Sequence, residues 1–418
     1  MTAAPAEARA RRFAATLTGS RLRSVRSART QRTMAPDLRD RDTPRSEESM
    51  PFEPCVVTLT GTTRRDHERV AHAALAERLA ALLGRAFAGE YDAHAGHAGH
   101  VYFVPDETLL LDRARELRIA GPCDLFGGVV PDRVVATKAI THGTIDGDDA
   151  PDGWRPQLAE RLREVVLDGY TAFSADAALS AGKRLLEQGA VRVKPAHLLG
   201  GAGQTVASNA QELGAALSAL DARALRDHGV VLEQNIDAPR VFSVGEVRVA
   251  GLDIAYYGTQ REVANHAGEQ VYGGSDLHIV RGGIAGLLDL GLAAELRLAV
   301  VQTLAYDAAV REAFPDFFAS RRNYDVLQGR DSTGREVSGV LEQSWRIGGA
   351  SPAEIAALRA FAADPALQSV HASSHEVYTP PHVAPPEAEV LYDGTDAHAG
   401  RLLKYSVVES VSRRGEEA

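Results

Sequence analysis

The sequence predicts a mixed α/β protein, α+β in its larger part, in which a small parallel layer precedes a longer region of antiparallel strands. Between residues 51 and 130, short apolar runs alternate with helical segments, and this alternation is typical of parallel strand pairing. Beyond residue 190, several strand-like runs follow one another in an order typical of antiparallel sheets. A length of 418 residues exceeds one simple core and favours two or three packed subdomains.

Composition restricts the class of protein. The apolar fraction of 44% and the charged fraction of 24% are ordinary for a soluble globular protein. The net charge of −10 argues against a general nucleic-acid binder, because phosphate neutralisation needs a basic surface. No apolar run approaches the roughly 20 residues that a membrane-spanning helix needs. The spacing of Cys55 and Cys123 suits neither a metal site nor a disulfide framework. We therefore expect a cytoplasmic protein that binds neither nucleic acid nor membrane.

Residues 1–49 differ in composition from the rest of the chain. They are rich in Arg, Ala, Ser and Thr, as transit peptides are, but the acidic residues in their second half oppose that interpretation. Met50 directly precedes the first strand-like run, so an over-long start is an alternative. We expect residues 1–49 to form a disordered tail.

Residues 50–130 form the predicted α/β pre-domain. The apolar run at residues 54–61 ends on glycine and is typical of a buried strand, and residues 101–104 form a second short strand. Apolar residues at helical spacing predict a helix at 66–84, between these two strands. Another helix is predicted at 109–117, after the second strand.

Three histidines of the pre-domain, His94, His97 and His100, recur every three residues. This spacing brings ligands together only on a helix, and the Ala-Gly pairs between the histidines oppose a stable helix. We therefore expect a surface loop here rather than a metal site.

The rest of the chain divides into three predicted segments. Residues 131–228 form one subdomain, residues 229–365 form a second, and residues 366–418 form an extended, proline-rich C-terminal segment. The elements expected in the two subdomains are helices at 154–169, 174–189, 209–220, 287–313 and 352–362, and strands at 191–194, 229–233, 241–245, 247–257, 323–328 and 339–342.

A glycine-rich loop follows a strand that ends near Lys194. Gly200, Gly201 and Gly203 would allow backbone N–H groups to crowd a phosphate, and the lysine would supply positive charge. The spacing does not fit a Walker A loop. The loop also leads into another strand, whereas the dinucleotide fingerprint leads into a helix. A glycine-rich hairpin without a ligand is the alternative.

The strand that begins near residue 230 ends on polar residues. Glu233 and Gln234 could hydrogen-bond the polar edge of a purine, while apolar neighbours such as Ile236 flank the ring. The alternative is a strand that simply ends in a polar turn.

The segment 338–351 presents three polar side chains on one face of a strand. Glu342, Ser344 and Arg346 alternate along it before a double glycine ends it. A carboxylate suits a hard cation and a guanidinium suits a phosphate. Asp325 lies on the preceding strand, and a turn signal between the two strands predicts a hairpin in which Asp325 and Glu342 meet. Two such carboxylates repel each other unless a cation lies between them. A solvated strand edge is the alternative.

In their order, these features resemble the ATP-grasp superfamily of carboxylate–amine ligases and biotin-carboxylase-like enzymes, over roughly residues 130–352. The resemblance implies an ATP-grasp fold behind a pre-domain, in one of the uncharacterised bacterial branches. It also implies roles for single residues. The ATP-binding lysines would be Lys138 and Lys194, the phosphate loop Gly200 to Gly203, the adenine hinge Glu233, the metal ligands Asp325, Glu342 and Ser344, and the catalytic arginine Arg346.

The resemblance further implies an activity. ATP, with Mg²⁺ or Mn²⁺, would phosphorylate a small carboxylate for attack by an amine, and Arg261 and Arg281 would bind the substrate carboxylate. Ser344 departs from the family, which usually has Asn at this position. Activation of bicarbonate and a non-catalytic nucleotide-binding protein are the alternatives, and a homodimer is compatible with each of them.

Overall fold

The computed structural model describes residues 54–61, 65–95, 97, 99–145, 148–198 and 203–413. The predicted disordered tail at 1–49 lies outside the described residues, as do Gly200 and Gly201. None of the described helices is long and apolar enough to cross a membrane.

The pre-domain contains a parallel three-stranded sheet in the order β2-β1-β3. Helix α2 connects the first two strands and packs against both of them, and it ends at Gly84, whose φ of 65° is the left-handed conformation that favours glycine. The expected parallel layer is therefore present. The additional strand β2 was not predicted, because its side chains are all at least partly exposed and give no apolar run. The bounds are β1 Cys55–Leu59, α2 Asp66–Leu83, β2 Ala86–Glu90 and β3 Val101–Pro105.

A second small sheet joins the pre-domain to the later part of the chain. Its order is β13-β5-β4, so a strand from the C-terminal half pairs with one that precedes residue 131. The predicted helix at 109–117 is divided here into a short strand and a short helix. The bounds are β4 Leu109–Leu110, α3 Leu111–Glu116, β5 Gly128–Val130, η1 Arg133–Ala136, η2 Lys138–Thr141 and β13 Phe318–Ala319.

A four-stranded antiparallel sheet, in the order β6-β9-β7-β8, forms the centre of the next subdomain. Helices α5 and α6 cover it with a shared apolar core that includes Leu185, Leu213 and Leu232. The predicted helix at 154–169 is shorter in the structure, where it spans Pro156–Leu162. The bounds are α4 Pro156–Leu162, β6 Gly169–Ala172, α5 Ala175–Leu186, β7 Val191–Pro195, β8 Thr205–Ala207, α6 Ala210–Ser218, α7 Ala222–His228 and β9 Val230–Gln234.

An eight-stranded antiparallel sheet, in the order β15-β14-β10-β11-β12-β16-β18-β17, dominates the C-terminal half. Neighbouring strands pair antiparallel, and among them β10, β11 and β12 follow one another in the chain as a meander. The bounds are β10 Asp237–Val249, β11 Leu252–Ala264, β12 Gln270–Arg281, β14 Arg321–Arg330, β15 Glu336–Ser344, β16 Leu367–Val377, β17 Glu389–Asp396 and β18 Gly400–Arg413.

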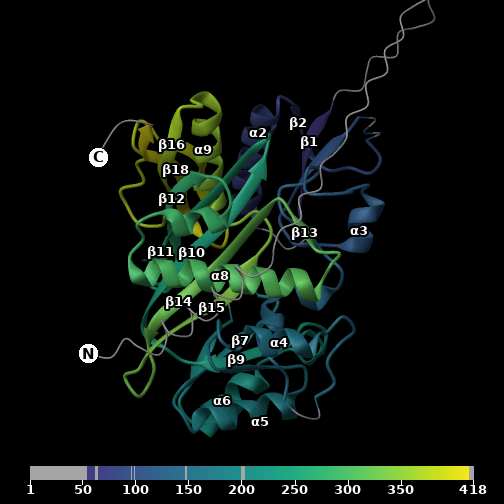
Figure 1. Cartoon of the computed structure of the whole chain (residues 1–418), viewed down its shortest axis with the longest axis vertical. Helices are drawn as coiled ribbons and strands as arrows, with labels where there is room; N and C mark the ends of the chain where they lie inside the picture. Colours follow the sequence, from purple (N-terminus) through teal and green to yellow (C-terminus); the bar gives the residue numbers. More distant parts are fainter. Residues whose placement is uncertain are drawn as a thin grey trace, which may run out of the picture. The chain divides into compact units, whose positions relative to one another are not determined.

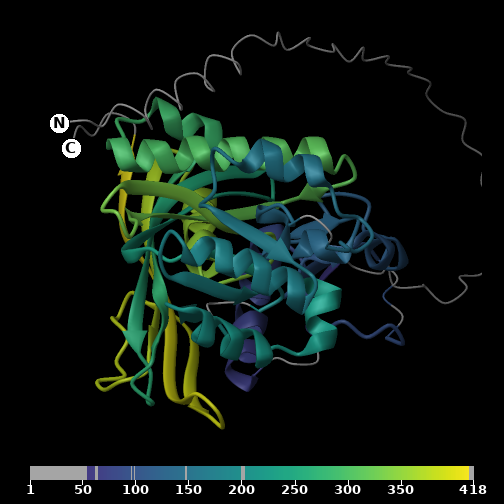
Figure 2. The same ribbon diagram turned by 90° about the horizontal axis from the view of Figure 1, so that it is seen from below.

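Helices cover different halves of this sheet from opposite faces. Helix α8 (Ala294–Ala313), which follows the short η3 (Ile284–Asp289), crosses β10, β14 and β15 and packs on Tyr324 and Val326 (Figure 1). Seen from below, α8 runs along one side of these strands (Figure 2). Helix α9 (Ser351–Ala363) packs together with α2 on the opposite face of the sheet, whose apolar residues include Leu277. The face that carries Tyr324 is therefore left without a helix at β12, β16 and β18 among the described residues.

The C-terminal segment corrects a prediction. Residues 366–418 were expected to be extended and proline-rich, but strands β16, β17 and β18 occupy most of them and complete one edge of the large sheet. Their prolines are confined to the connection between β16 and β17. One face of β16 is polar, with His371, Ser373 and His375 in alternation, so its sequence shows no apolar run by which a strand is recognised.

Candidate active site

The predicted metal-binding carboxylates lie on the hairpin of β14 and β15. In the ladder, Asp325 is directly opposite Glu342, and Asn323 is directly opposite Ser344. Tyr324 points towards α8, so alternation along the strand places Asp325 on the opposite face. The two carboxylates that the sequence predicts to meet across a hairpin thus do lie side by side.

Lys138 is buried against this hairpin. It begins the turn η2, where the Thr137 hydroxyl accepts a hydrogen bond from the backbone N–H of Ala139. Gln343 of β15 donates to the Thr137 carbonyl at 2.7 Å. The Lys138 ammonium lies 2.6 Å from Glu342 Oε2, and its side chain is only 4% exposed. Burial alone would raise the pKa of Glu342, but the positive charge of Lys138 lowers it. Glu342 is therefore held as a carboxylate.

Asp325 has the opposite electrostatic character. Burial raises its pKa, and the negative charge of Glu342 raises it further, against hydrogen bonds from Asn323 (2.9 Å) and Ser243 (3.1 Å). Two carboxyl groups that face each other supply oxygen ligands of the kind that Mg²⁺ or Mn²⁺ prefers, so the residues present fit such an ion.

A second buried charge cluster surrounds Glu233 at the end of β9. Lys194, on the adjacent strand β7, forms an ion pair with its Oε2, and the His142 ring nitrogen Nε2 lies 2.8 Å from its Oε1. Burial would raise the pKa of Glu233, but Lys194 and His142 lower it to about 2. Sequence reasoning missed His142, because a single histidine after a helical turn carries no signal of its own.

The two clusters belong to one electrostatic environment. Lys194, although paired with Glu233, also lowers the pKa of Glu342. Tyr306 of α8 lies near both carboxylates, and burial together with their negative charges raises its pKa. Its hydroxyl donates to Gln343 at 3.0 Å, beside the hairpin. The structure thus brings Lys138, Lys194, Glu233, Asp325 and Glu342 into one site.

The other predicted nucleotide-binding residues have mixed outcomes. Gly203 has a φ of 68°, a conformation suited to glycine, at the described end of the predicted loop. Gln234 is buried beside Glu233. Ile236 packs with Leu167 and Leu327 in a small apolar cluster of its own. Their roles towards a nucleotide stay predictions.

Ser344, the third predicted metal ligand, is engaged elsewhere. Its hydroxyl accepts a hydrogen bond from Arg321 at 3.2 Å, and its carbonyl accepts another at 3.0 Å. Arg321 in turn pairs with Glu354, and both side chains are almost fully buried. Ser344 therefore contributes to a packed structural network beside the site.

The three predicted catalytic arginines separate in the structure. Arg346 lowers the pKa of Glu342 and donates to the Ile347 carbonyl at 2.6 Å, so it lies at the site. Arg281 lies on β12, with two strands between it and β14, and donates to the carbonyls of Leu367 (3.0 Å) and Phe361 (2.9 Å). Its guanidinium connects α9 to β16 there, and the structure does not bring it to the carboxylate pair.

Arg261 is held in a similar way. It donates to the Ser374 carbonyl at 2.6 Å and contacts the ring of His375. By the alternation of β11, it lies on the face of the sheet opposite to Asp325. The predicted role in binding the substrate carboxylate gains no support from this position.

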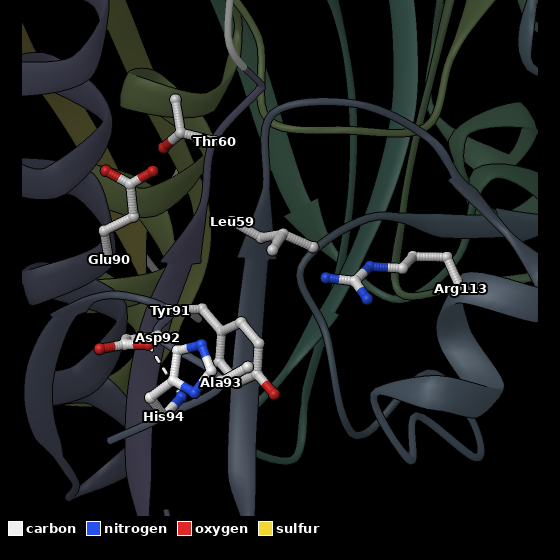
Figure 3. A pocket seen from close by; sticks show the side chains of 8 residues that line it. All are labelled: Leu59, Thr60, Glu90, Tyr91, Asp92, Ala93, His94 and Arg113. Carbon is white, nitrogen blue, oxygen red and sulfur yellow. Dashed lines mark hydrogen bonds between the residues drawn. The ribbon is translucent and has the colours of Figure 1, made fainter. Parts of the chain in front are cut away.

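A separate pocket of about 360 Å³ lies at the carboxyl ends of β1 and β2 in the pre-domain (Figure 3). Arg113 reaches into it from α3, opposite Glu90 and Asp92. Carboxyl ends of parallel strands are common ligand sites. Its lining residues are Leu59, Thr60, Glu90, Tyr91, Asp92, Ala93, His94 and Arg113.

The three histidines beside this pocket do not converge on one point. The backbone of His94 donates to Asp92 at 2.8 Å, the ring of His97 stacks on Tyr91, and His100 lies 2.8 Å from Asp124. The described residues of this segment form turns, in agreement with the expected loop.

Several solved structures are similar to this chain at low identity. Phosphoribosylamine–glycine ligase from Thermotoga maritima has 12% identity and a TM-score of 0.49, over 85% of this chain and 92% of that chain. N5-carboxyaminoimidazole synthase from Aspergillus clavatus, solved with ADP and 5-aminoimidazole ribonucleotide, has 12% identity and a TM-score of 0.47, over 85% and 94%. Biotin carboxylase from Campylobacter jejuni has 13% identity and a TM-score of 0.45, over 87% and 88%.

A search of curated proteins found no match. A family profile, in contrast, matches residues 56–406, from the first strand of the pre-domain to the last strand of the large sheet. The match thus includes the pre-domain, both lysines and the carboxylate hairpin. The chain belongs to the DUF3182 family, which is described as a protein of unknown function.

Proposed function

We propose that this chain is an ATP- and Mg²⁺-dependent ligase of ATP-grasp type, which activates a small carboxylate as an acyl phosphate for attack by an amine. The observation that carries the proposal is the facing pair Asp325 and Glu342, one with a raised and one with a lowered pKa, among buried lysines. Such an arrangement is costly for stability alone, and perturbed carboxylates of this kind cluster at functional sites.

Each residue has a physical role in this proposal. Asp325 and Glu342 would hold Mg²⁺, which when bound neutralises the charge that develops on the phosphates. Lys138, Lys194 and Arg346 would bind the phosphate oxygens. Both lysines already face a carboxylate, so phosphate oxygens would compete with Glu342 and Glu233 for the same ammonium groups.

His142 and Glu233 would fix the position of Lys194. Glu233 is only 1% exposed and stays ionised throughout the physiological pH range, with a pKa of about 2. It therefore holds the lysine ammonium in place for the phosphates. Its predicted contact with adenine would have to use the part of the carboxylate that these two partners leave accessible.

One observation favours a second candidate function. The Ser344 hydroxyl is bound by Arg321, and position 344 is where the resemblance predicts an amide ligand. A site with only two carboxylate ligands would bind nucleotide more readily than it would align phosphates for transfer. A non-catalytic nucleotide-binding protein is therefore the alternative, whereas bicarbonate activation would use the same residues as the ligase.

The experiment that tests the proposal measures ADP and phosphate release with Mg²⁺-ATP across a panel of amino acids, small carboxylates and bicarbonate. We expect release with one of these substrates, and its loss in Asp325→Asn and Glu342→Gln. Glu295→Gln, a carboxylate at the partly exposed N-terminus of α8, is the matched control. Substrate-stimulated release that survives both site substitutions would disprove the proposal. Mg²⁺-ATP binding without any stimulated release would favour the non-catalytic alternative.

A further inference from the structure

A second group of potential metal ligands lies at β12 and β16, in the part of the large sheet's α8 face that no described helix covers. Asp276 and His278 are two residues apart on β12 and therefore share a face. His371, on the neighbouring strand β16, is directly opposite His278 in the ladder. Leu277, between the two β12 residues, points into the apolar core with α9. The register of two strands thus gathers two imidazoles and a carboxylate on one surface.

The three side chains are close enough to share one ion. Their ligand atoms all lie within 4.8 Å of one another, and Asp276 Oδ1 is 2.8 Å from His371 Nε2. The rings of His278 and His371 are stacked, with centroids 4.4 Å apart and planes inclined by 6°. In a tetrahedral zinc site the ligand atoms are about 3.3 Å apart, given Zn–N distances of about 2.0–2.1 Å. A metal ion lies in the plane of each imidazole that binds it, so a shared ion would require one of the two stacked rings to rotate out of the stack.

The chemistry of the three side chains suits a transition-metal ion. A neutral imidazole offers a nitrogen lone pair, and imidazole is a common ligand of such ions. The ring of Tyr257 stacks on the other side of His278, with the two ring centroids 5.3 Å apart. Asp276 supplies the negative charge that a cation requires.

The part of β16 that follows His371 continues the cluster's face with polar residues. Ser373 and His375 continue the same face of β16, and Ser373 donates a hydrogen bond to Glu409. Arg261 lies beside His375, where its guanidinium is held by the Ser374 carbonyl at 2.6 Å. The positive charge of Arg261 therefore lies beside His375. The carboxylate of Glu409 partly offsets this charge.

We propose that Asp276, His278 and His371 bind a divalent transition-metal ion of the Zn²⁺ type. Two imidazoles and one carboxylate favour such an ion over Mg²⁺, which prefers oxygen ligands, and they leave a coordination position open for water or a ligand. The site is separate from the Asp325–Glu342 pair, because it lies on the other face of the sheet and does not depend on the proposed ATP chemistry.

The test uses the full chain after removal of metal with EDTA. Titration with Co²⁺, followed by its visible d–d absorption, is expected to show one tight equivalent per chain, and Zn²⁺ is expected to displace it. His278→Gln and His371→Gln should each weaken binding by more than about tenfold, since even outer-shell partners change metal affinity by that amount. His266→Gln, at an exposed histidine near β18, is the matched control.

Two further measurements keep the test decisive. The Asp325→Asn/Glu342→Gln double variant should retain the Co²⁺ spectrum, which separates this site from the proposed ATP site. If a histidine variant does not fold, modification of His278 by diethylpyrocarbonate in the unmodified sequence, measured by mass spectrometry, should be slowed by Zn²⁺. Absence of d–d bands, bands unchanged by both histidine substitutions, or no protection of His278 would overturn the proposal.

Discussion

Two buried charge clusters share the β14–β15 hairpin, and they differ in how their charges are balanced. Arg321 and Glu354 are 1% and 0% exposed and form several hydrogen bonds with each other, at 2.7 to 3.2 Å. In the Asp325–Glu342 pair, Lys138 pairs with Glu342, whereas burial and the negative charge of Glu342 raise the pKa of Asp325. The first cluster is balanced and is costly to break. The second is unbalanced in that Asp325 forms no ion pair among the described residues, and a carboxyl group with a raised pKa is typical of functional sites. Burial of charge by itself therefore does not identify an active site.

The largest expected effect tests the balanced cluster. Arg321→Met should lower the free energy of unfolding by about 3–5 kcal/mol, because it leaves Glu354 buried without its partner. Thermal or urea unfolding measures this change. Arg330→Met, which removes an exposed pair with Glu336, is the control and should change stability by less than about 1 kcal/mol. Equal effects of the two substitutions would contradict the comparison.

The next effect tests the unbalanced cluster. Asp325→Asn should decrease substrate-stimulated ADP release about 100-fold or more, which corresponds to about 2.7 kcal/mol of transition-state stabilisation. Stability should be retained or raised, because the substitution removes the repulsion with Glu342. Parallel activity and unfolding measurements on this variant check both. A loss of stability as large as that of Arg321→Met would show that Asp325 is structural.

A smaller effect is expected on nucleotide binding. The double variant Lys194→Met/Glu233→Gln should bind ATP about tenfold more weakly, or about 1.4 kcal/mol, because one charged contact to the phosphates is lost. Glu233 is replaced as well, because Lys194→Met alone would leave its buried carboxylate without the lysine partner. Isothermal titration calorimetry measures the affinity, and Lys183→Met, at an exposed position of α5, is the control. Unchanged ATP affinity in the double variant would remove Lys194 from the site.

The smallest effect concerns pH. The pKa of Glu233 is depressed to about 2, so the stability it contributes is present above its unfolded pKa of about 4.5 and is lost as pH falls towards 2. The pKa of Asp325 is raised, so its contribution has the opposite sign: it is present at low pH and is lost as pH rises through the folded pKa. Unfolding measured across acidic pH should therefore become less acid-sensitive in Glu233→Gln and more acid-sensitive in Asp325→Asn. If the free energy of unfolding depended on pH in the same way in both variants, the opposite pKa shifts of Glu233 and Asp325 would be contradicted.

Local patterns were sufficient to predict much of the fold. Apolar periodicity indicated α2, and a turn signal between two apolar strands indicated the hairpin that pairs Asp325 with Glu342. The same approach missed β16, β17 and β18. A strand with one polar face, such as β16 with His371 and His375, has neither an apolar run nor a helical period to reveal it.

Individual site residues were harder to predict than the elements that carry them. Arg281 resembles a substrate-binding arginine in sequence, yet its guanidinium connects α9 to β16. His142 attracted no interest in sequence, yet it is hydrogen-bonded to Glu233. The difference arises because a side chain's role depends on partners that are far away in the chain, and periodicity carries no information about them.

The sequence by itself determined which strands end in charged residues, because alternation along a strand is a local property of the chain. It thereby placed Asp325 and Glu342 on facing strands and Lys194 at the end of another. Only the tertiary structure decided how the charges are compensated: Lys138 with Glu342, Lys194 with Glu233, and Arg321 with Glu354. Compensation depends on distance and burial in three dimensions, so only the packing decides which charged residues become partners.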